Sequence, residues 1–234
     1  MIADVVIAAL ALDPGRIAHC AALLSAEETA RADRFLREAD RTRFIASHAA
    51  LRVVVGRECG LPPERLRFAT ESTGRPVLAE PAGTDLDINL SHSGDIALIG
   101  LVRGARIGVD VEIRRPLPDA LRIARSHFAP DETAALEALP PSWREAAFFG
   151  LWTRKEAVVK ALGAGLSQPL AGFSVTVPPE PARMLRITGG TAQWTLATLD
   201  PGPGACATVA VTAAGVAIRR QSRSATWADK FDAK

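Results

Sequence analysis

The chain carries a pair of acids, Asp110 and Glu112, separated only by Val111 in a strand-like segment that we place at residues 107–113. Successive side chains of a strand point to opposite faces, so both carboxylates leave the same face. Neighbouring carboxylates repel each other, and a hard, oxygen-seeking cation such as Mg²⁺ relieves that repulsion. The pattern predicts a metal site, and its alternative is a strand end with two solvated acids.

A second pattern lies in a predicted helix, where Trp152, Glu156 and Lys160 are spaced four residues apart and therefore share one face. Glu156 followed by Lys160 is also an ordinary stabilising pair on a helix surface. The glycines at 163 and 165 after this helix indicate a tight exit with close backbone approach. Lys155 lies about 100° around the helix from Glu156 and faces elsewhere.

Two shorter segments offer polar groups at strand ends and turns. In the segment Asn89-Leu90-Ser91-His92-Ser93, the histidine can bind phosphate, act as a base or hydrogen-bond the turn. Gly74-Arg75-Pro76 is typical of a turn with one cation. Residues 31–75 contain ten arginines and six acids, so this region either faces an anion or is a solvated, arginine-rich surface.

The elements that position these residues follow the order strand, helices, strands, and this order occurs twice. It predicts an α+β fold of two similar lobes. Two capping boxes, Ser25 with Glu28 and Ser142 with Glu145, mark helix starts. We expect helices at 26–38, 40–55, 119–128, 131–139 and 143–162. We expect strands at 5–12, 66–69, 77–79, 87–91, 96–102, 107–113, 173–177, 184–187, 194–199 and 208–213.

The composition of the 234 residues is that of an ordinary folded protein, with 48% hydrophobic and 23% charged residues. A net charge of +2 gives no reason to expect binding to nucleic acid or to an anionic membrane surface. Three widely spaced cysteines and the lack of a signal peptide or spanning segment favour a reduced, cytoplasmic protein. Only four of the 28 basic residues are lysines, and two of these are Lys155 and Lys160.

Taken together and in this order, these segments resemble the Sfp-type 4′-phosphopantetheinyl transferases over residues 30–177. The combination of G-x-D-x-E with W-x-x-K-E-x-x-x-K is specific to that family. The resemblance rests on Gly74–Pro76, Ile88–Ser93, Ile107–Glu112 and Trp152–Leu166. It is extended by Arg34-Phe35, Arg43, Leu51-Arg52, Phe128, Glu132 and Phe173–Val175.

The resemblance implies a monomer of two lobes related by pseudo-twofold symmetry, each a small, mainly antiparallel sheet packed with helices. We place the lobes at residues 1–104 and 105–218, followed by a polar tail at 219–234. Coenzyme A is expected in the cleft between the lobes. With Mg²⁺ or Mn²⁺, the enzyme would transfer the 4′-phosphopantetheine arm to a serine of an apo acyl or peptidyl carrier protein and release 3′,5′-ADP.

The resemblance also implies a role for each matched residue. Asp110, Glu112 and Glu156 would bind the metal, and Glu156 is our hypothesis for the base that deprotonates the serine. Lys160 would act on the phosphates as a catalytic residue. The expected contacts to coenzyme A come from Arg43 at the 3′-phosphate, His92 and Lys160 at the phosphates, and Gly74, Arg75, Pro76 and Ser91 at the nucleotide. Lys155 is also expected to bind coenzyme A, and its alternative role is to support the wall of the cleft. Arg75 stands where many relatives have lysine, which changes the hydrogen-bonding geometry.

Other functions fit some of the same residues. A metal-dependent phosphodiesterase or nuclease would use the same acids, and an inactive domain would only bind coenzyme A or a carrier. The natural carrier stays open between peptide synthetases and polyketide synthases of secondary metabolism, fatty acid synthases and others. Carrier docking is expected on a basic rim formed by Arg114, Arg115, Arg122 and Arg125, and scattered surface arginines are the alternative.

Overall fold

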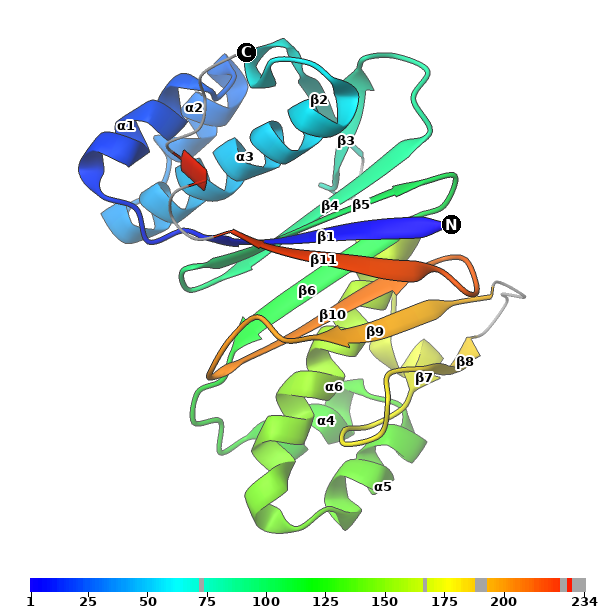
Figure 1. Cartoon of the computed structure of the whole chain (residues 1–234). Helices are drawn as coiled ribbons and strands as arrows, with labels where there is room; N and C mark the ends of the chain where they lie inside the picture. Colours follow the sequence, from blue (N-terminus) through cyan, green and yellow to red (C-terminus); the bar gives the residue numbers. More distant parts are fainter. Residues whose placement is uncertain (72–73, 166–167, 188–192, 224–226, 229–234) are drawn as a thin grey trace.

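Helices form the two outer layers of the molecule and strands fill the middle, as the computed structural model in Figure 1 shows. The structure describes residues 1–71, 74–165, 168–187, 193–223 and 227–228. The first part of the chain forms β1 (Ile2–Ala9), α1 (Pro14–Ala22), α2 (Ala26–Ala32), α3 (Glu38–Cys59), β2 (Arg67–Thr70), β3 (Pro76–Glu80), β4 (Leu86–Ser93) and β5 (Ile96–Arg103). The second part forms β6 (Ile107–Ile113), α4 (Ala120–His127), α5 (Pro130–Ala138), α6 (Pro141–Leu162), β7 (Phe173–Val175), β8 (Met184–Ile187), β9 (Thr195–Leu199), β10 (Ala205–Val211) and β11 (Ala217–Arg223).

The two parts repeat one topology. One strand is followed by three helices, a small two-stranded sheet and two further strands, and the sheet orders β1-β5-β4 and β6-β10-β9 correspond. The long helices α3 and α6 both have 22 residues, and each ends at a glycine in the left-handed region, Gly60 at φ 65° and Gly163 at φ 69°. The expected α+β fold of two similar lobes is confirmed.

Local signals placed some helix starts correctly and one wrongly. The Ser25–Glu28 capping box is present at α2, which ends at Ala32, earlier than expected. The expected box at Ser142 is wrong, because α6 already begins at Pro141. Its second member, Glu145, instead accepts a hydrogen bond from the backbone N–H of Leu117 at 3.0 Å. None of the helices in the described ranges is long and apolar enough to cross a bilayer.

The end of the chain returns to the first lobe, where β11 pairs with β1 in parallel register from Ile2 opposite Ala217. The expected polar tail is therefore wrong for residues 219–223, because a long-range pairing orders them. Trp227 is buried and donates its Nε1–H to the carbonyl of Ala9 at 2.7 Å. The rest of the expected tail, including Lys230 and Lys234, lies outside the described residues. We propose that the lobe boundary lies in the turn between β5 and β6, at residues 104–105.

An apolar core joins the two sheets at the centre of the molecule. It contains Val5 and Leu98 from the first lobe and Val109, Val111 and Val209 from the second. Two further apolar cores lie between each sheet and its own helices. The lobes are thus held together by a buried layer of their own.

Beside this apolar core, the edge strands β4 and β6 are joined by side chains instead of by backbone pairing. Every second side chain of β4 accepts a hydrogen bond from a backbone N–H of β6 twenty residues further along the chain, so the two strands run parallel. We call this arrangement the β4–β6 ladder. Its bonds are Ile107 N–H to Asp87 at 2.7 Å, Val109 N–H to Asn89 at 2.8 Å, Val111 N–H to Ser91 at 3.4 Å and Ile113 N–H to Ser93 at 3.1 Å.

We expect the buried centre of the ladder to matter more than its open end. Asn89→Leu keeps the volume but leaves the buried N–H of Val109 without an acceptor, which should lower the free energy of unfolding by about 1–3 kcal/mol. Ser93→Ala at the half-buried end should cost less, because water can reach the N–H of Ile113. Urea unfolding of both variants measures the difference, and equal losses would show that the ladder does not carry the interface.

Candidate functional site

The acidic strand β6 lies directly beneath the long helix α6 because residue 108 has no side chain. A Cβ atom added at Gly108 would lie 2.0 Å from the carbonyl oxygen of Ala157 and 2.5 Å from the nitrogen of Ala161. Only glycine permits this approach of the two backbones. The contact brings Glu156 and Lys160 of α6 to the same place as Asp110 of β6.

Three side chains from three elements meet where the ladder passes under α6. The Nζ of Lys160 donates to Asp110 Oδ1 at 2.6 Å and to Ser91 Oγ at 2.9 Å. Ser91 Oγ donates to Asp110 Oδ1 at 3.0 Å. The other oxygen of Asp110, Oδ2, is buried without a hydrogen-bond partner in the described part of the chain. Burial raises the pKa of Asp110, while Lys160 and Ser91 oppose the shift.

The two glutamates of the predicted metal set are half-buried around this group. Glu112 accepts a hydrogen bond from Ser93 Oγ at 3.2 Å and lies 3.6 Å from Nη1 of Arg115. Burial, followed by repulsion from Asp110, raises the pKa of both Glu112 and Glu156, and Glu112 also repels Glu156. The structure therefore brings the three acids into mutual electrostatic contact.

Asp110, Glu112 and Glu156, which we call the acidic cluster, have a donor chemistry that fits a hard divalent cation. As the side chains stand, no group of three or more His, Cys, Asp or Glu side chains within the described ranges is arranged to hold a metal ion. Oδ2 of Asp110 is nevertheless a buried carboxylate oxygen without a partner in the described residues. It lies near Glu112 and Glu156, whose pKa values are raised by burial and then by repulsion from Asp110. A bound cation would give this oxygen a partner and would relieve the repulsion among the carboxylates.

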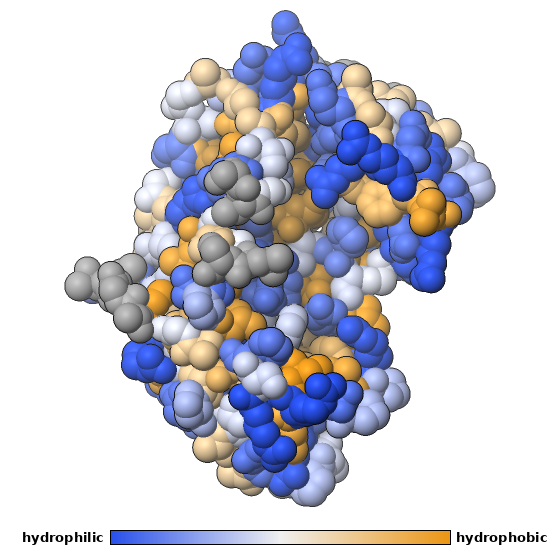
Figure 2. All heavy atoms as spheres, turned by 180° about the vertical axis from the view of Figure 1, so that it is seen from behind, coloured by the Kyte–Doolittle hydropathy of each residue, from blue (hydrophilic) through white to orange (hydrophobic). Residues whose placement is uncertain are grey.

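A large cavity of about 1170 Å³ opens next to the acidic cluster, within the first lobe. Asp110, Glu112, Glu156 and Lys160 do not line this cavity. His92, the neighbour of Ser91 on β4, does line it. Figure 2 shows the back face hollowed between its upper and lower parts, with hydrophilic residues on the rim. The cavity lining combines cations, aromatic rings and acids. Its cations and rings include Arg31, Arg43, His48, Arg65, Arg67, Phe44 and Phe68, and its acids are Glu27, Glu28, Asp40, Glu64 and Glu80. The arginine excess over residues 31–75 was the sequence signal for this lining, although it did not single out His48 or Arg31.

Arg43 and His92, two of the residues expected to contact coenzyme A, both line this cavity. Arg43 donates its Nε–H to Asp95 at 3.1 Å, and its side chain is 35% exposed, so its guanidinium is still open to a ligand. Partial desolvation, followed by the charges of His48, Lys160 and Arg43, lowers the pKa of His92. A phosphate bound here would counter that shift by stabilising the protonated ring.

The segment Gly74–Pro76 is divided by the structure. Gly74 and Pro76 line the cavity, whereas Arg75 between them does not. The side chain of Arg75 is buried and donates to Asp87 and to three backbone carbonyls. The prediction that the Arg75 side chain contacts a nucleotide is therefore wrong in this arrangement, because its guanidinium faces the junction of β4, β6 and α6.

Lys155 is also misassigned as a residue that binds coenzyme A. It is fully buried in the second lobe, and its Nζ donates to both carboxylate oxygens of Glu132 and to the carbonyl of Phe173 at 2.9 Å. Glu132 additionally accepts the backbone N–H groups of Ala129 and Val175. The turn angle of a helix explains the error, since the position next to Glu156 points into the lobe core and not into the cleft.

The comparisons with known proteins agree with this geometry. A family model described as the 4′-phosphopantetheinyl transferase superfamily matches residues 106–212, and one described as 4′-phosphopantetheinyl transferase, N-terminal, matches residues 14–101. The chain is 37% identical to the 4′-phosphopantetheinyl transferase HetI of Nostoc, over 83% of this chain and 81% of the relative. It is 34% identical to psf-1 of Bacillus pumilus, over 76% and 75%, and 29% identical to Sfp of Bacillus subtilis, over 77% and 79%.

Removing one partner of the buried ion pair between Lys155 and Glu132 should lower the stability of the protein strongly. We expect Lys155→Met to lower the free energy of unfolding by about 3–5 kcal/mol, because it leaves the Glu132 charge buried without a cation. Arg122→Met, which removes an exposed pair with Asp119, is the matched control and should have little effect on the free energy of unfolding. If urea unfolding gives both variants the same stability, the pair does not organise this lobe.

Because the pKa of Glu156 is raised, we expect that removing its charge stabilises the fold and that this stabilisation depends on pH. The folded metal-free protein binds this proton more tightly than the unfolded chain does, so wild type loses stability as the pH rises through the raised value. Glu156→Gln should therefore be more stable than wild type at pH 7, by on the order of 1 kcal/mol, and the gain should vanish below about pH 4. Thermal unfolding in EDTA across this range measures it, with the exposed Glu38→Gln as control. A gain that does not depend on pH would contradict the electrostatic origin.

Proposed function

The chain belongs to the 4′-phosphopantetheinyl transferase superfamily, as an enzyme of the Sfp type, and we propose that it transfers the phosphopantetheine arm of coenzyme A to an apo carrier protein. The acceptor is a serine hydroxyl of the carrier, and the other product is 3′,5′-ADP. The observation that carries the proposal is the meeting of Lys160, Asp110 and Ser91 beside two further acids, next to a cavity whose lining includes five arginines, two histidines and five acids.

The cavity in the first lobe suits the charged end of coenzyme A. Its phosphates would be met by Arg43 and His92, with Arg43 at the 3′-phosphate. The backbone at Gly74 and Pro76 would border the nucleotide, and the aromatic rings of the lining can contact the base. Ser91 links the cavity to the acidic cluster. It lies next to His92 on strand β4 and accepts a hydrogen bond from Lys160.

A divalent cation, Mg²⁺ or Mn²⁺, would be held by Asp110, Glu112 and Glu156. These carboxylates supply the oxygen ligands that Mg²⁺ prefers, and Val111 points into the apolar core, so water would complete the shell. When bound, the ion neutralises charge on the pyrophosphate that a neutral hydroxyl must approach.

Lys160 and Glu156 would divide the proton and charge transfers of the reaction. The serine oxygen forms a bond to the phosphorus next to the pantetheine, and the bond from that phosphorus to the departing nucleotide phosphate breaks. Lys160 would donate a hydrogen bond to the departing phosphate, where negative charge accumulates. Glu156 would take the serine proton.

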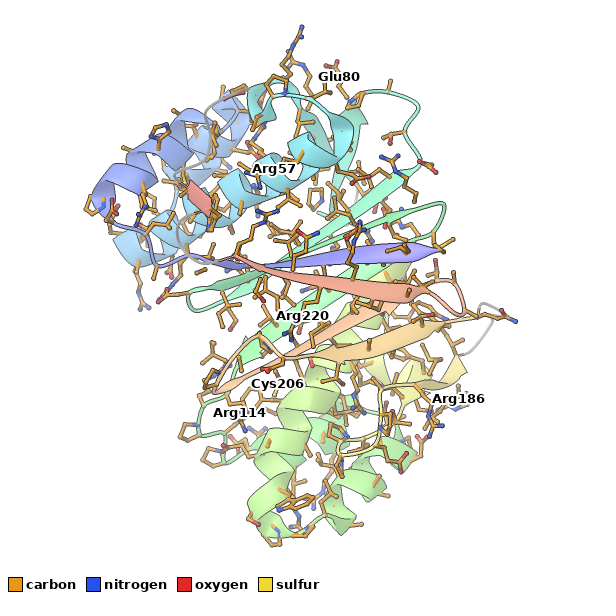
Figure 3. The ribbon with its side chains drawn as sticks, in the orientation of Figure 1. Arg57, Glu80, Arg114, Arg186, Cys206 and Arg220 are labelled. Carbon is orange, nitrogen blue, oxygen red and sulfur yellow. The ribbon has the colours of Figure 1, made fainter. Side chains whose placement is uncertain are left out.

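The carrier would dock beside the end of β6, where Arg114 lies in Figure 3. Three of the four arginines expected there are matched with acids, namely Arg115 with Glu112, Arg122 with Asp119 and Arg125 with Glu137. Arg114 is exposed and carries the docking proposal best. We further propose that the enzyme acts as a cytoplasmic monomer, since both walls of the site come from one chain.

Incubation with coenzyme A, Mg²⁺ and several apo carriers tests the function. We expect at least one carrier to gain the mass of the phosphopantetheine arm, and we expect no gain when its acceptor serine is alanine. Asp110→Asn and removal of metal with EDTA should each abolish the gain, because both leave the pyrophosphate charge uncompensated. Added Mg²⁺ should also raise the Tm of wild type but not of Asp110→Asn.

The alternatives give different products in the same assay. Cleavage of coenzyme A without any modified carrier would identify a phosphodiesterase. Binding of coenzyme A or carrier with neither product would identify an inactive binding domain. Either result would overturn the proposed transfer.

A further inference from the structure

Arg75 makes more polar contacts across the lobe junction than its place in a surface turn led us to expect. Its Nη2 donates to Asp87 Oδ2 at 2.6 Å, to the carbonyl of Ile88 at 2.9 Å and to the carbonyl of Ile107 at 2.8 Å. Its Nη1 donates to the carbonyl of Lys160. One guanidinium therefore links β4, the start of β6 and the last turn of α6.

The contact with α6 falls on the residue whose other end lies in the acidic cluster. Lys160 is held by Arg75 at its backbone carbonyl and by Asp110 and Ser91 at its Nζ. The carbonyls of the last helical turn carry partial negative charge, so a cation placed there is favourable. The bonds of Arg75 to β4 and β6 fix that helix end relative to the strands that bear Ser91 and Asp110.

A second arginine supports the same helix end. Arg106 binds Glu71 through two hydrogen bonds of 2.9 and 3.1 Å, and its Nε lies 3.9 Å from Asp87. A Cβ added at Gly163, the residue that ends α6, would lie 2.5 Å from Nη2 of Arg106. Glu71, Arg75, Asp87 and Arg106 thus form one ionic network against the end of α6, which we call the helix-end network.

We propose that Arg75 is a positioning residue for Lys160 and not a ligand of coenzyme A. The helix-end network sets where Lys160 stands relative to Asp110 and Ser91, and hence relative to the departing phosphate. The inference rests on the proposed transfer reaction, in which Lys160 is the group that meets that phosphate.

The network also gives a physical reason for arginine, and not lysine, at this position. A guanidinium is a planar fork with five donors, and two of its nitrogens reach four acceptors on three elements here. A single ammonium nitrogen cannot span the same acceptors. A lysine at position 75 would release the helix end, even though it keeps the charge.

The test is the kinetics of Arg75→Lys with coenzyme A and an apo carrier that wild type modifies, with the carrier saturating. We expect kcat to fall about ten- to hundredfold, the cost of a small displacement of a catalytic group. The KM for coenzyme A should stay within about twofold of wild type, because no contact to it is lost. The matched control is Arg103→Lys on the neighbouring strand β5, where the arginine binds Glu58 and Asp85 at the surface; its kcat should not change.

Other results would overturn the inference. A raised KM with unchanged kcat would make Arg75 a direct ligand of coenzyme A, and unchanged kcat with a lowered Tm would make it structural only. If Arg75→Lys does not fold, Asp87→Asn weakens the same network and is read in the same way.

Hydrogen exchange separates a failure of this inference from a failure of the proposed function. Amides in the last turn of α6 should exchange faster in Arg75→Lys than in wild type or Arg103→Lys, whatever the reaction is. An unchanged exchange rate would refute the inference that Arg75 holds the end of α6 in place. A wild-type chain that modifies no carrier would instead refute the proposed function.

Discussion

The contact on which the rest of this structure depends is the β4–β6 ladder. The edge of a sheet exposes unpaired backbone N–H groups, and here the edge of the second lobe meets the edge of the first without a shared backbone ladder. Side chains of β4 satisfy those groups instead, beside an apolar core built from both lobes. Asp87 and Ser91 serve twice: each accepts a backbone N–H of β6 and also binds a cation, Arg75 or Lys160. The joint between the lobes and the charged site are therefore one hydrogen-bonded system.

Each lobe has a buried cation paired with a glutamate at the same place in its topology. In α3 the cation is Arg52, bound to Glu28 at 2.7 Å, and in α6 it is Lys155, bound to Glu132. Both cations are the fifteenth residue of a 22-residue helix, and both glutamates accept a backbone N–H at the start of the preceding helix. This correspondence is a sign of internal repetition that the amino-acid types hide, because the cations differ. The two sites have diverged around it: α3 borders the cavity, and α6 carries Glu156 and Lys160.

The acidic cluster is held in an unfavourable state by the folding of the protein. Three carboxylates are brought together under α6. Burial raises the pKa of all three, and repulsion from neighbouring acids further raises the pKa of Glu112 and Glu156. Lys160 compensates one of them in the arrangement described. Such a cluster costs stability, which is expected where a protein is organised around a charged ligand and not around its own packing.

The sequence by itself determined the features that depend on neighbouring residues. The strand with Asp110 and Glu112, the helix with Glu156 and Lys160, the glycine that ends it and the first capping box follow from periodicity and local hydrogen bonds. The motif combination, and with it the family, was also readable. Tertiary structure decided the rest: that Lys155 points into a lobe core, that Arg75 faces α6 and not the cavity, and that residues 217–223 pair with the first strand. These outcomes depend on partners far away in the chain, whose distance and burial no local pattern encodes.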